Sequence, residues 1–402
     1  MTQSAAGTPS DDAGAELTLL AQTCDALFAD HAGDHAGDHA GDHGGERDGW
    51  WDERLWAALE QAGIPLISVP EAAGGSGGTL EQAAVALISA GEHAARVPAA
   101  ETMLLGGWLL AEAGLPVPAG PLTAAGPLTA AGATAAQAAR GTAARRAGRA
   151  GPLSVNRVPD GWLVQGRLPR VGWGRVAQRV VVLAESGAAE LAIALRPGDV
   201  TVTPGGNVAG EPRDDLTVDV AVDDAAVAEV AAGTGAALRL RAALARVLLI
   251  AGAMRRALDL TVRYAGERQQ FGRSLSNFQA IQQQIAELAA ETAAVRAAAD
   301  AAVARCAAEG FAGPGAWLAV AAAKVQAARG ATLAARTAHQ VHGAIGFTGE
   351  HQLHLTTTRL WAWRDEAGSQ AEWAAELGRH VLAAGPLWPL ITGAERHGER
   401  HG

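Results

Sequence analysis

Apolar residues recur every three or four positions near the beginning of the chain. One stripe is formed by Leu17, Leu20, Ala21 and Cys24, and a second by Trp51, Leu55, Trp56 and Leu59. This spacing places apolar side chains on one face of a helix. A glycine at position 63 stops the second stripe, and a helical pattern resumes over residues 80–113. We therefore predict an N-terminal helical domain over residues 1–114.

Between residues 152 and 230 the period of the apolar pattern changes to two. Short apolar runs bounded by turn residues follow one another at 162–166, 180–184 and 191–195. Such runs, rich in β-branched residues, predict a small β domain over residues 152–230. The preceding stretch, residues 115–151, repeats Gly-Pro-Leu-Thr-Ala-Ala and is predicted to be a low-complexity linker.

Helical spacing returns from residue 231 to the end of the chain. One long helix is predicted over about residues 235–264, and another begins at Pro314 and ends near His342. Between them, Ser276 and Gln279 have the spacing of a capping box, which predicts a helix start at Ser276. The order helical, β, helical predicts an α+β fold of three parts, in which residues 231–402 form a helical bundle.

Composition narrows the classes of function. The chain has 32 Lys and Arg against 42 Asp and Glu, a net charge of −10, which argues against nucleic acid as the main partner. The two cysteines, Cys24 and Cys306, cannot form a disulfide framework, so we expect a reducing, cytoplasmic setting. We expect neither a secretory leader nor a membrane span, because the most apolar run is too short to cross a bilayer.

A repetitive insert at residues 31–45 spaces four histidines four residues apart. They are His31, His35, His39 and His43, and aspartates alternate with them. On a helix these side chains would form a metal-binding stripe. Each repeat also contains a glycine, however, which costs about 1 kcal/mol per position in a helix. We therefore favour a solvated loop over a metal site, and predict no metal centre.

The loop around Arg268 carries the first candidate chemistry. A guanidinium beside a helix start can bind two phosphate oxygens at once, and the helix adds free N–H donors. Phe271 could cover an aromatic ring, and Gln270 and Gln279 could donate amide hydrogen bonds. The alternative is a surface arginine paired with Glu267.

A second candidate is the segment from Gln340 to Thr348. Gly343 follows the predicted helix and would let the backbone approach a ligand closely. The alternative is a plain glycine C-cap. The residues alone leave both interpretations open.

Together these segments resemble the acyl-CoA dehydrogenase family. The C-terminal part carries Arg268-x-x-Phe271-Gly272, Leu275, Phe278-Gln279 and Gln340-x-His342-Gly343-x-x-Gly346-Phe347-Thr348-x-Glu350. The N-terminal part carries Leu59-x-x-x-Gly63 and Val69-Pro70-Glu71-x-x-Gly74-Gly75-Ser76-Gly77, and the β domain carries Pro159-Asp160-Gly161-Trp162 and Asn207-Val208-Ala209-Gly210-Glu211. The resemblance covers most of the chain in the family's order.

The resemblance implies a helical domain, a small middle β domain and a four-helix bundle. It also implies a homo- or hetero-oligomer, a dimer or tetramer, with FAD at the subunit contacts. The residues expected to hold the FAD pyrophosphate and adenosine are Arg268, Gln270, Phe271, Leu275 and Gln279. Gln340 and Gly343 would contact the same cofactor from a neighbouring subunit. Trp173 lies where a flavin-facing residue is expected, although core packing is the commoner role of a tryptophan.

In this family a glutamate removes the α-proton of an acyl thioester while the flavin accepts the β-hydride. The segment 366–370 partly matches the family's base motif, so Glu366 is the predicted catalytic base and Asp365 a weaker candidate. The family's other base position falls near Ala242, among non-acidic residues. The predicted function is FAD-dependent α,β-dehydrogenation of an acyl-CoA or carrier-bound acyl thioester. The alternative is a catalytically incompetent subunit that completes the FAD site or scaffolds a partner dehydrogenase.

Overall fold

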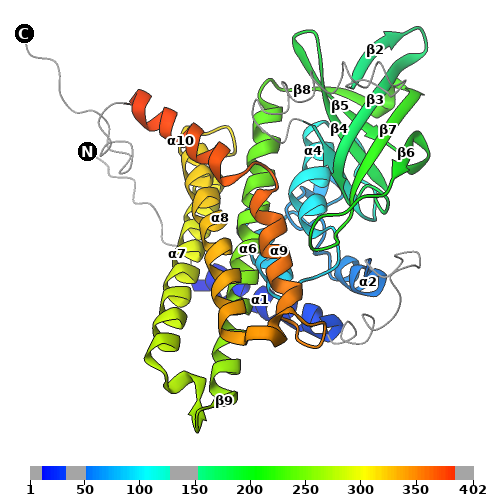
Figure 1. The fold of residues 1–402 in the computed structure, drawn as a ribbon. Helices are drawn as coiled ribbons and strands as arrows, with labels where there is room; N and C mark the ends of the chain where they lie inside the picture. Colours follow the sequence, from blue (N-terminus) through cyan, green and yellow to red (C-terminus); the bar gives the residue numbers. More distant parts are fainter. Residues whose placement is uncertain (1–10, 33–50, 127–152, 385–402) are drawn as a thin grey trace, which may run out of the picture.

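The computed structural model describes residues 11–32, 51–126 and 153–384 (Figure 1). Its N-terminal part is helical, as predicted. The elements are α1 (Asp11–Ala32), α2 (Glu53–Gln61), α3 (Leu80–Glu92), a π-helical turn (Glu101–Gly106) and α4 (Gly107–Glu112). Thr79 caps α3, because its hydroxyl accepts from the Gln82 N–H while the Gln82 side chain accepts from the Thr79 N–H. Most of the insert at 31–45 lies outside the described residues.

Two four-stranded sheets form the middle domain. One has the order β1-β4-β5-β8 and the other β2-β3-β7-β6. The strands of the first are β1 (Leu122–Ala125), β4 (Arg179–Ser186), β5 (Ala189–Leu195) and β8 (Val227–Val230). Those of the second are β2 (Ser154–Val158), β3 (Gly161–Gly172), β7 (Arg213–Val222) and β6 (Val200–Thr203). Apolar side chains of both sheets, including Val164, Val182 and Leu216, share one buried cluster.

One strand lies where the sequence predicted a linker. Residues Leu122–Ala125 run parallel to Arg179–Val182 as strand β1. All four residues of this strand are buried, and Thr123 donates its hydroxyl to the carbonyl of Gly172. The linker prediction is therefore wrong for these positions, because tertiary pairing overrides a local composition typical of loops. The remainder of the repeat, from residue 127, lies outside the described part of the chain.

Long helices form the C-terminal part. They are α6 (Thr234–Glu267), α7 (Gln279–Glu309), α8 (Pro314–His342), α9 (Leu353–Asp365) and α10 (Gln370–Ala384). In Figure 1, α6, α7 and α8 run side by side, and a two-stranded hairpin of β9 (Gln269–Gln270) and β10 (Arg273–Ser274) projects from the end of the bundle. Among the described residues no helix is long and apolar enough to cross a membrane.

The predicted capping box at Ser276 does not form. Residues Leu275–Asn277 make a 3₁₀ turn, and α7 begins at Gln279 after Phe278. The backbone carbonyl of Ser276 accepts a hydrogen bond from the side chain of Gln282. The hairpin that precedes α7 displaces the helix start by about one turn, so a pattern of two residues was not enough to locate it.

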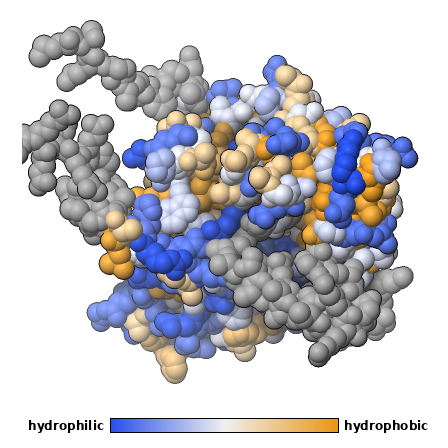
Figure 2. All heavy atoms as spheres, turned by 90° about the horizontal axis from the view of Figure 1, so that it is seen from above, coloured by the Kyte–Doolittle hydropathy of each residue, from blue (hydrophilic) through white to orange (hydrophobic). Residues whose placement is uncertain are grey.

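Helix α6 is the central element of the core. Its residues from Ala242 to Met254 are all buried, which is typical of a helix surrounded by other elements. It crosses α3 closely at two glycines, since a Cβ at Gly91 would collide with the carbonyl oxygen of Leu249 and a Cβ at Gly252 with that of Ile88. In contrast to this core, the surface of the molecule seen from above carries both hydrophilic and hydrophobic residues (Figure 2).

This crossing predicts a stability effect with a control on the same helix. Gly252→Ala should lower the free energy of unfolding by about 2–3 kcal/mol, because the added methyl group forces α3 and α6 apart. Gly266→Ala, where a Cβ meets no atom within 4 Å, should leave stability unchanged or raise it by up to about 1 kcal/mol. Urea unfolding of both variants measures the difference, and equal effects would contradict the close crossing.

Candidate functional site

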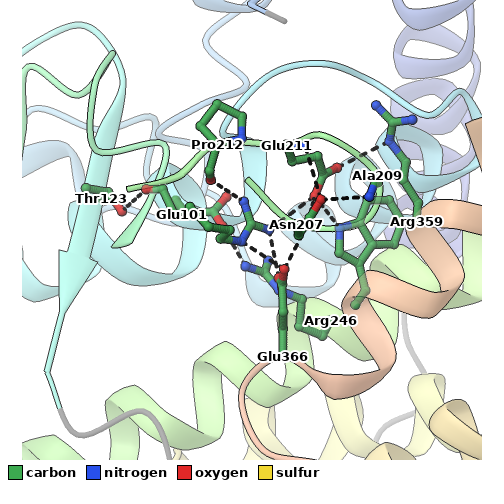
Figure 3. Close-up of polar contacts among 12 residues, drawn as sticks. Glu101, Thr123, Asn207, Ala209, Glu211, Pro212, Arg246, Arg359 and Glu366 are labelled. Carbon is green, nitrogen blue, oxygen red and sulfur yellow. Dashed lines mark hydrogen bonds and ion pairs between the residues drawn. The ribbon is translucent and has the colours of Figure 1, made fainter. Parts of the chain in front are cut away.

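A buried network of six charged side chains joins the three parts of the fold (Figure 3). Its carboxylates are Glu101, Glu211 and Glu366, and its guanidinium groups are Arg213, Arg246 and Arg359. Glu101 belongs to the N-terminal helical domain, Glu211 and Arg213 to the β domain, and the others to the C-terminal bundle. Three negative charges face three positive charges, so the network is neutral overall, as burial of charge requires.

Glu366 occupies the centre of this network. Arg213 donates two hydrogen bonds to its two carboxylate oxygens, from Nε at 2.8 Å and from Nη2 at 2.7 Å. The Nε atom of Arg246 lies 2.8 Å from Oε2, and Asn207 Nδ2 donates to Oε1 at 2.9 Å. A carboxylate held by a guanidinium fork in this way has both oxygens committed.

The remaining members extend the network on both sides. Arg246 donates from Nη2 to Glu101 at 2.6 Å. Glu211 accepts from Arg213 at 3.1 Å and from the indole N–H of Trp363 at 2.9 Å, and Arg359 Nε lies 3.2 Å from its other oxygen. The contributions of these contacts to stability depend on one another, because removing one charged side chain leaves its partner buried without an opposite charge.

This environment argues against the predicted role of Glu366 as catalytic base. Burial by itself raises the pKa of Glu366, but the charges of Arg213 and Arg246 outweigh it and lower the pKa to about 2. A general base is effective when its pKa lies near the working pH and its oxygen can reach the proton. Glu366 meets neither condition. Asp365 is exposed and forms an ion pair with Arg364, so it is no better placed.

The described residues leave a small cavity beside the network. A cavity of about 20 Å³ lies next to Glu101, Arg213 and Arg246, with Trp173 and Trp363 in its wall. That volume accommodates about one water molecule. Trp173 is almost completely buried, and its ring lies edge-on to that of Trp51. The core-packing interpretation of Trp173 is therefore the one this geometry supports.

Lys324 binds the helix that precedes Glu366. It is fully buried in α8 and donates from Nζ to the carbonyl oxygens of Trp363 and Arg364, at 3.1 and 2.8 Å. These carbonyls belong to the last turn of α9, directly before Glu366, so Lys324 caps the helix that presents Glu366. Burial lowers the pKa of Lys324 to about 7.

Sequence reasoning missed most of this network. Arg246 interrupts the apolar run over residues 242–254, and Glu101 lies beside a buried stretch of Met and Leu residues. A charge inside an otherwise apolar run indicates a buried ion pair, and that signal could have identified these two residues. Asn207 and Glu211 were identified only as part of a family-like segment.

The second candidate site lies at the other end of α6, on the hairpin of β9 and β10. Phe271 and Gly272 form its two-residue turn with φ angles of +51° and +80°. Such a turn favours Asn-Gly, and a bulky residue at positive φ is strained. The Phe271 side chain is nevertheless 90% exposed. A strained and exposed aromatic residue indicates a role in contacts with a ligand or partner.

Arg268 begins this hairpin and is available for a ligand. Its backbone N–H donates to the carbonyl of Tyr264 at 2.9 Å, and its carbonyl accepts from the N–H of Leu275 at 2.9 Å. Its side chain is exposed, and among the described residues no carboxylate pairs with it. The alternative pairing with Glu267 is therefore not formed. A fixed backbone and an unpaired guanidinium are what an anion-binding residue requires.

The structure gathers the other predicted cofactor residues around this end of the bundle. Gln270 is exposed on β9, Leu275 starts the 3₁₀ turn, and Gln279 is the exposed first residue of α7. Gln340 and Gly343 are exposed at the end of α8, where Gly343 has a φ of +63°. Glu366 lies far from this group, because it contacts Arg246 near the middle of α6. Arg246 and Arg268 are separated by about 33 Å along the helix, at a rise of about 1.5 Å per residue.

The buried network predicts an acid-dependent loss of stability. Glu366→Gln should lower the free energy of unfolding at pH 7 by about 3–5 kcal/mol, because two guanidinium groups lose their shared carboxylate. Since the folded-state pKa is lowered, the wild-type advantage is complete above the ordinary pKa of 4.5 and is lost as the pH falls towards 2.

Urea unfolding of the variant and the wild type across this pH range measures the effect. The matched control is Asp365→Asn, which removes an exposed carboxylate and should cost less than about 1 kcal/mol. Equal stability of the Glu366→Gln variant and the wild type at pH 7 would exclude the network as a stabilising element.

The chain is similar to known proteins over most of its length. A family model for the acyl-CoA dehydrogenase C-terminal domain matches residues 231–370. The acyl-CoA dehydrogenase FadE27 of Mycobacterium tuberculosis is 30% identical over 75% of this chain and 81% of its own length. The ChsE4–ChsE5 complex of Mycobacterium tuberculosis contains a chain with the same fold, with a TM-score of 0.76, 25% identity, and coverage of 94% of this chain and 99% of that one.

A glutaryl-CoA dehydrogenase of Mycobacterium smegmatis, solved in complex with FADH2, also shares the fold. Its TM-score is 0.74 and its identity 16%, over 92% of this chain and 95% of its own. The predicted three-part architecture is therefore confirmed. With an identity of 30% to a relative that it covers over four fifths of its length, this chain belongs to the acyl-CoA dehydrogenase family.

Proposed function

We propose that this chain is a subunit of an oligomeric, FAD-dependent dehydrogenase that introduces an α,β double bond into an acyl-CoA thioester. The observation that carries the proposal is the exposed guanidinium of Arg268, which pairs with no carboxylate among the residues that the structure describes and lies on a strained hairpin in a chain of this family. Two free, buried thiols, Cys24 and Cys306, further support a reducing, cytoplasmic setting.

The residues around the hairpin fit the pyrophosphate and adenosine part of FAD. The Arg268 guanidinium can bind two phosphate oxygens, and the side chains of Gln270 and Gln279 can donate to neighbouring oxygen or nitrogen atoms. The exposed ring of Phe271 can lie on a flat base. When bound, FAD would accept the β-hydrogen of the thioester as a hydride, while the α-proton would pass to a general base. Binding and orientation are the contributions of this chain's hairpin.

The hairpin serves a cofactor in a neighbouring subunit. It lies about 33 Å along α6 from Arg246, so it cannot reach the interdomain region of its own chain. In an oligomer, an exposed hairpin that projects from the bundle reaches a second protomer instead (Figure 1). The ChsE4–ChsE5 complex shows that a relative of this fold assembles with a different chain, which supports a hetero-oligomer.

A second candidate function is a subunit that completes the FAD site of a partner and performs no proton abstraction itself. The observation that favours it is the state of Glu366, which is bound by Arg213 and lies 2.8 Å from Arg246, beside a cavity of about 20 Å³. In that case the base and the acyl cavity belong to the partner. This chain would contribute the Arg268 hairpin and a rigid, closed interdomain contact.

Replacement of Arg268 tests the cofactor role common to both candidates. Arg268→Ala should weaken FAD binding by about tenfold or more, because a charge-assisted hydrogen bond contributes about 1.5–3 kcal/mol. The melting temperature of the apo-protein should be unchanged, since Arg268 has no ion pair in the described part of the chain. Titration of the purified oligomer with FAD, followed by flavin fluorescence, measures the affinity.

Arg296→Ala is the matched control for this experiment. Arg296 is an arginine on the surface of α7 that pairs with Asp300, and its removal should not change FAD affinity. If Arg268→Ala binds FAD as tightly as the Arg296 variant, the assignment of the pyrophosphate to Arg268 is wrong.

Flavin bleaching separates the two candidate functions. The full-length chain is purified alone, loaded with FAD and mixed with a panel of acyl-CoA thioesters. A complete dehydrogenase reduces the flavin under these conditions, whereas a completing subunit does so only after a partner chain is added. In both cases we expect Glu366→Gln, where it folds, to leave bleaching unchanged. Loss of bleaching in that variant with FAD still bound would restore Glu366 as the base.

A further inference from the structure

We propose that the stacked rings of Tyr264 and His342 position the two segments of the FAD half-site relative to each other. The inference rests on the proposed function, which assigns the Arg268 hairpin, like the Gln340–Gly343 segment, to the cofactor of a neighbouring subunit. Both segments of one chain then face the same FAD. These segments are far apart in the sequence, and the hairpin and the end of α8 each carry only part of the predicted contacts.

Tyr264 connects directly to the hairpin. It lies in the last turns of α6, and its carbonyl oxygen accepts the hydrogen bond from the N–H of Arg268 at 2.9 Å. This bond closes the final turn of the helix before the chain leaves it at Arg268. The direction in which the Arg268 side chain departs therefore depends on the backbone of Tyr264.

The ring of Tyr264 connects the same turn to the end of α8. It stacks on the imidazole of His342 with a centroid distance of 4.4 Å and an interplanar angle of 21°. His342 is the last residue of α8 and directly precedes Gly343. Because Gly343 has a φ of +63°, where the backbone turns sharply, the position of His342 determines where the following segment begins.

His342 is itself fixed on its other sides. It is buried, and its Nδ1–H donates to the carbonyl oxygen of Ala338 at 2.8 Å. The ring of His351, which precedes α9, meets it edge-on at 4.7 Å and approaches Tyr264 at 6.1 Å. Three rings from three segments thus meet at one point. None of these rings carries a predicted FAD contact, so their effect on FAD acts through the residues that they hold in place.

The expected consequence is a preorganised half-site. When both segments are already fixed, FAD binding does not have to order them, and the affinity is higher. Removing the stack should therefore weaken FAD binding while leaving turnover at saturating FAD unchanged. A residue that touched the cofactor or the substrate would change both.

The test is a double-mutant cycle in the full-length chain, purified in the oligomer that it forms. Tyr264→Leu should weaken FAD binding about three- to tenfold, as expected for loss of an aromatic pair. Tyr264→Phe keeps the ring and should bind FAD as the wild type does. Tyr264→Leu combined with Arg268→Ala should weaken FAD binding by less than the two single effects together, because part of the effect of Tyr264 acts through the placement of Arg268.

The outcomes separate this inference from the proposed function. An Arg268→Ala variant with normal FAD affinity overturns the proposed function, and the inference with it. If Arg268→Ala weakens binding but Tyr264→Leu has no effect, or the two effects add fully, only the inference is wrong. If Tyr264→Leu lowers the melting temperature of the apo-protein, the cycle is repeated with His342→Leu, which removes the same stack from the side of α8. The inference then requires the effects of His342→Leu and Arg268→Ala on FAD affinity to be non-additive as well.

Discussion

Burying a charge is costly unless an opposite charge lies beside it, and this constraint governs the centre of the molecule. Arg246 is almost completely buried in the centre of α6, where it has Glu101 on one side and Glu366 on the other. Glu366 in turn holds Arg213, and Arg213 holds Glu211. These five residues come from all three parts of the fold. The ion pairs that compensate the charge of Arg246 therefore also hold the helical domain, the β domain and the bundle against one another.

The same constraint decides what this interior can do chemically. A carboxylate that satisfies two guanidinium groups stabilises the fold in its ionised form and, for that reason, is a poor proton acceptor. Stability and general-base catalysis therefore make opposite demands on Glu366, and the distances of 2.7 and 2.8 Å to Arg213 and Arg246 favour stability. The far end of α6 shows the reverse situation, since the exposed side chain of Arg268 pairs with no carboxylate in the described part of the chain and is available to an anion.

The sequence predicted elements wherever local signals and tertiary packing agree. The helical pattern from residue 80 and the proline at position 314 mark helix starts correctly, because the cap formed by Thr79 and a fixed proline φ act within one turn. The strand at 122–125 was missed because its β structure comes from pairing with residues more than 50 positions away. Glu366 was located by its resemblance to a motif, but its role depends on Arg213 and Arg246, which no local spacing connects with it. Order along the chain thus indicated the family, whereas the function of individual residues required the three-dimensional contacts.

The hairpin gives the clearest evidence for a functional surface, because it departs from what folding alone would favour. Asparagine before Gly272 would adopt the left-handed turn with less strain than Phe271, and a polar side chain would not expose an aromatic ring to water. Within the described chain the ring of Phe271 contacts that of Phe278 edge-on, at a centroid distance of 6.2 Å, and the Phe271 side chain still remains 90% exposed. A residue that costs stability and solubility within its own chain, next to an unpaired arginine, is explained by contacts outside the chain. We propose that an FAD molecule held between this hairpin and a neighbouring subunit provides those contacts, since it would supply both a diphosphate for Arg268 and a flat ring for Phe271.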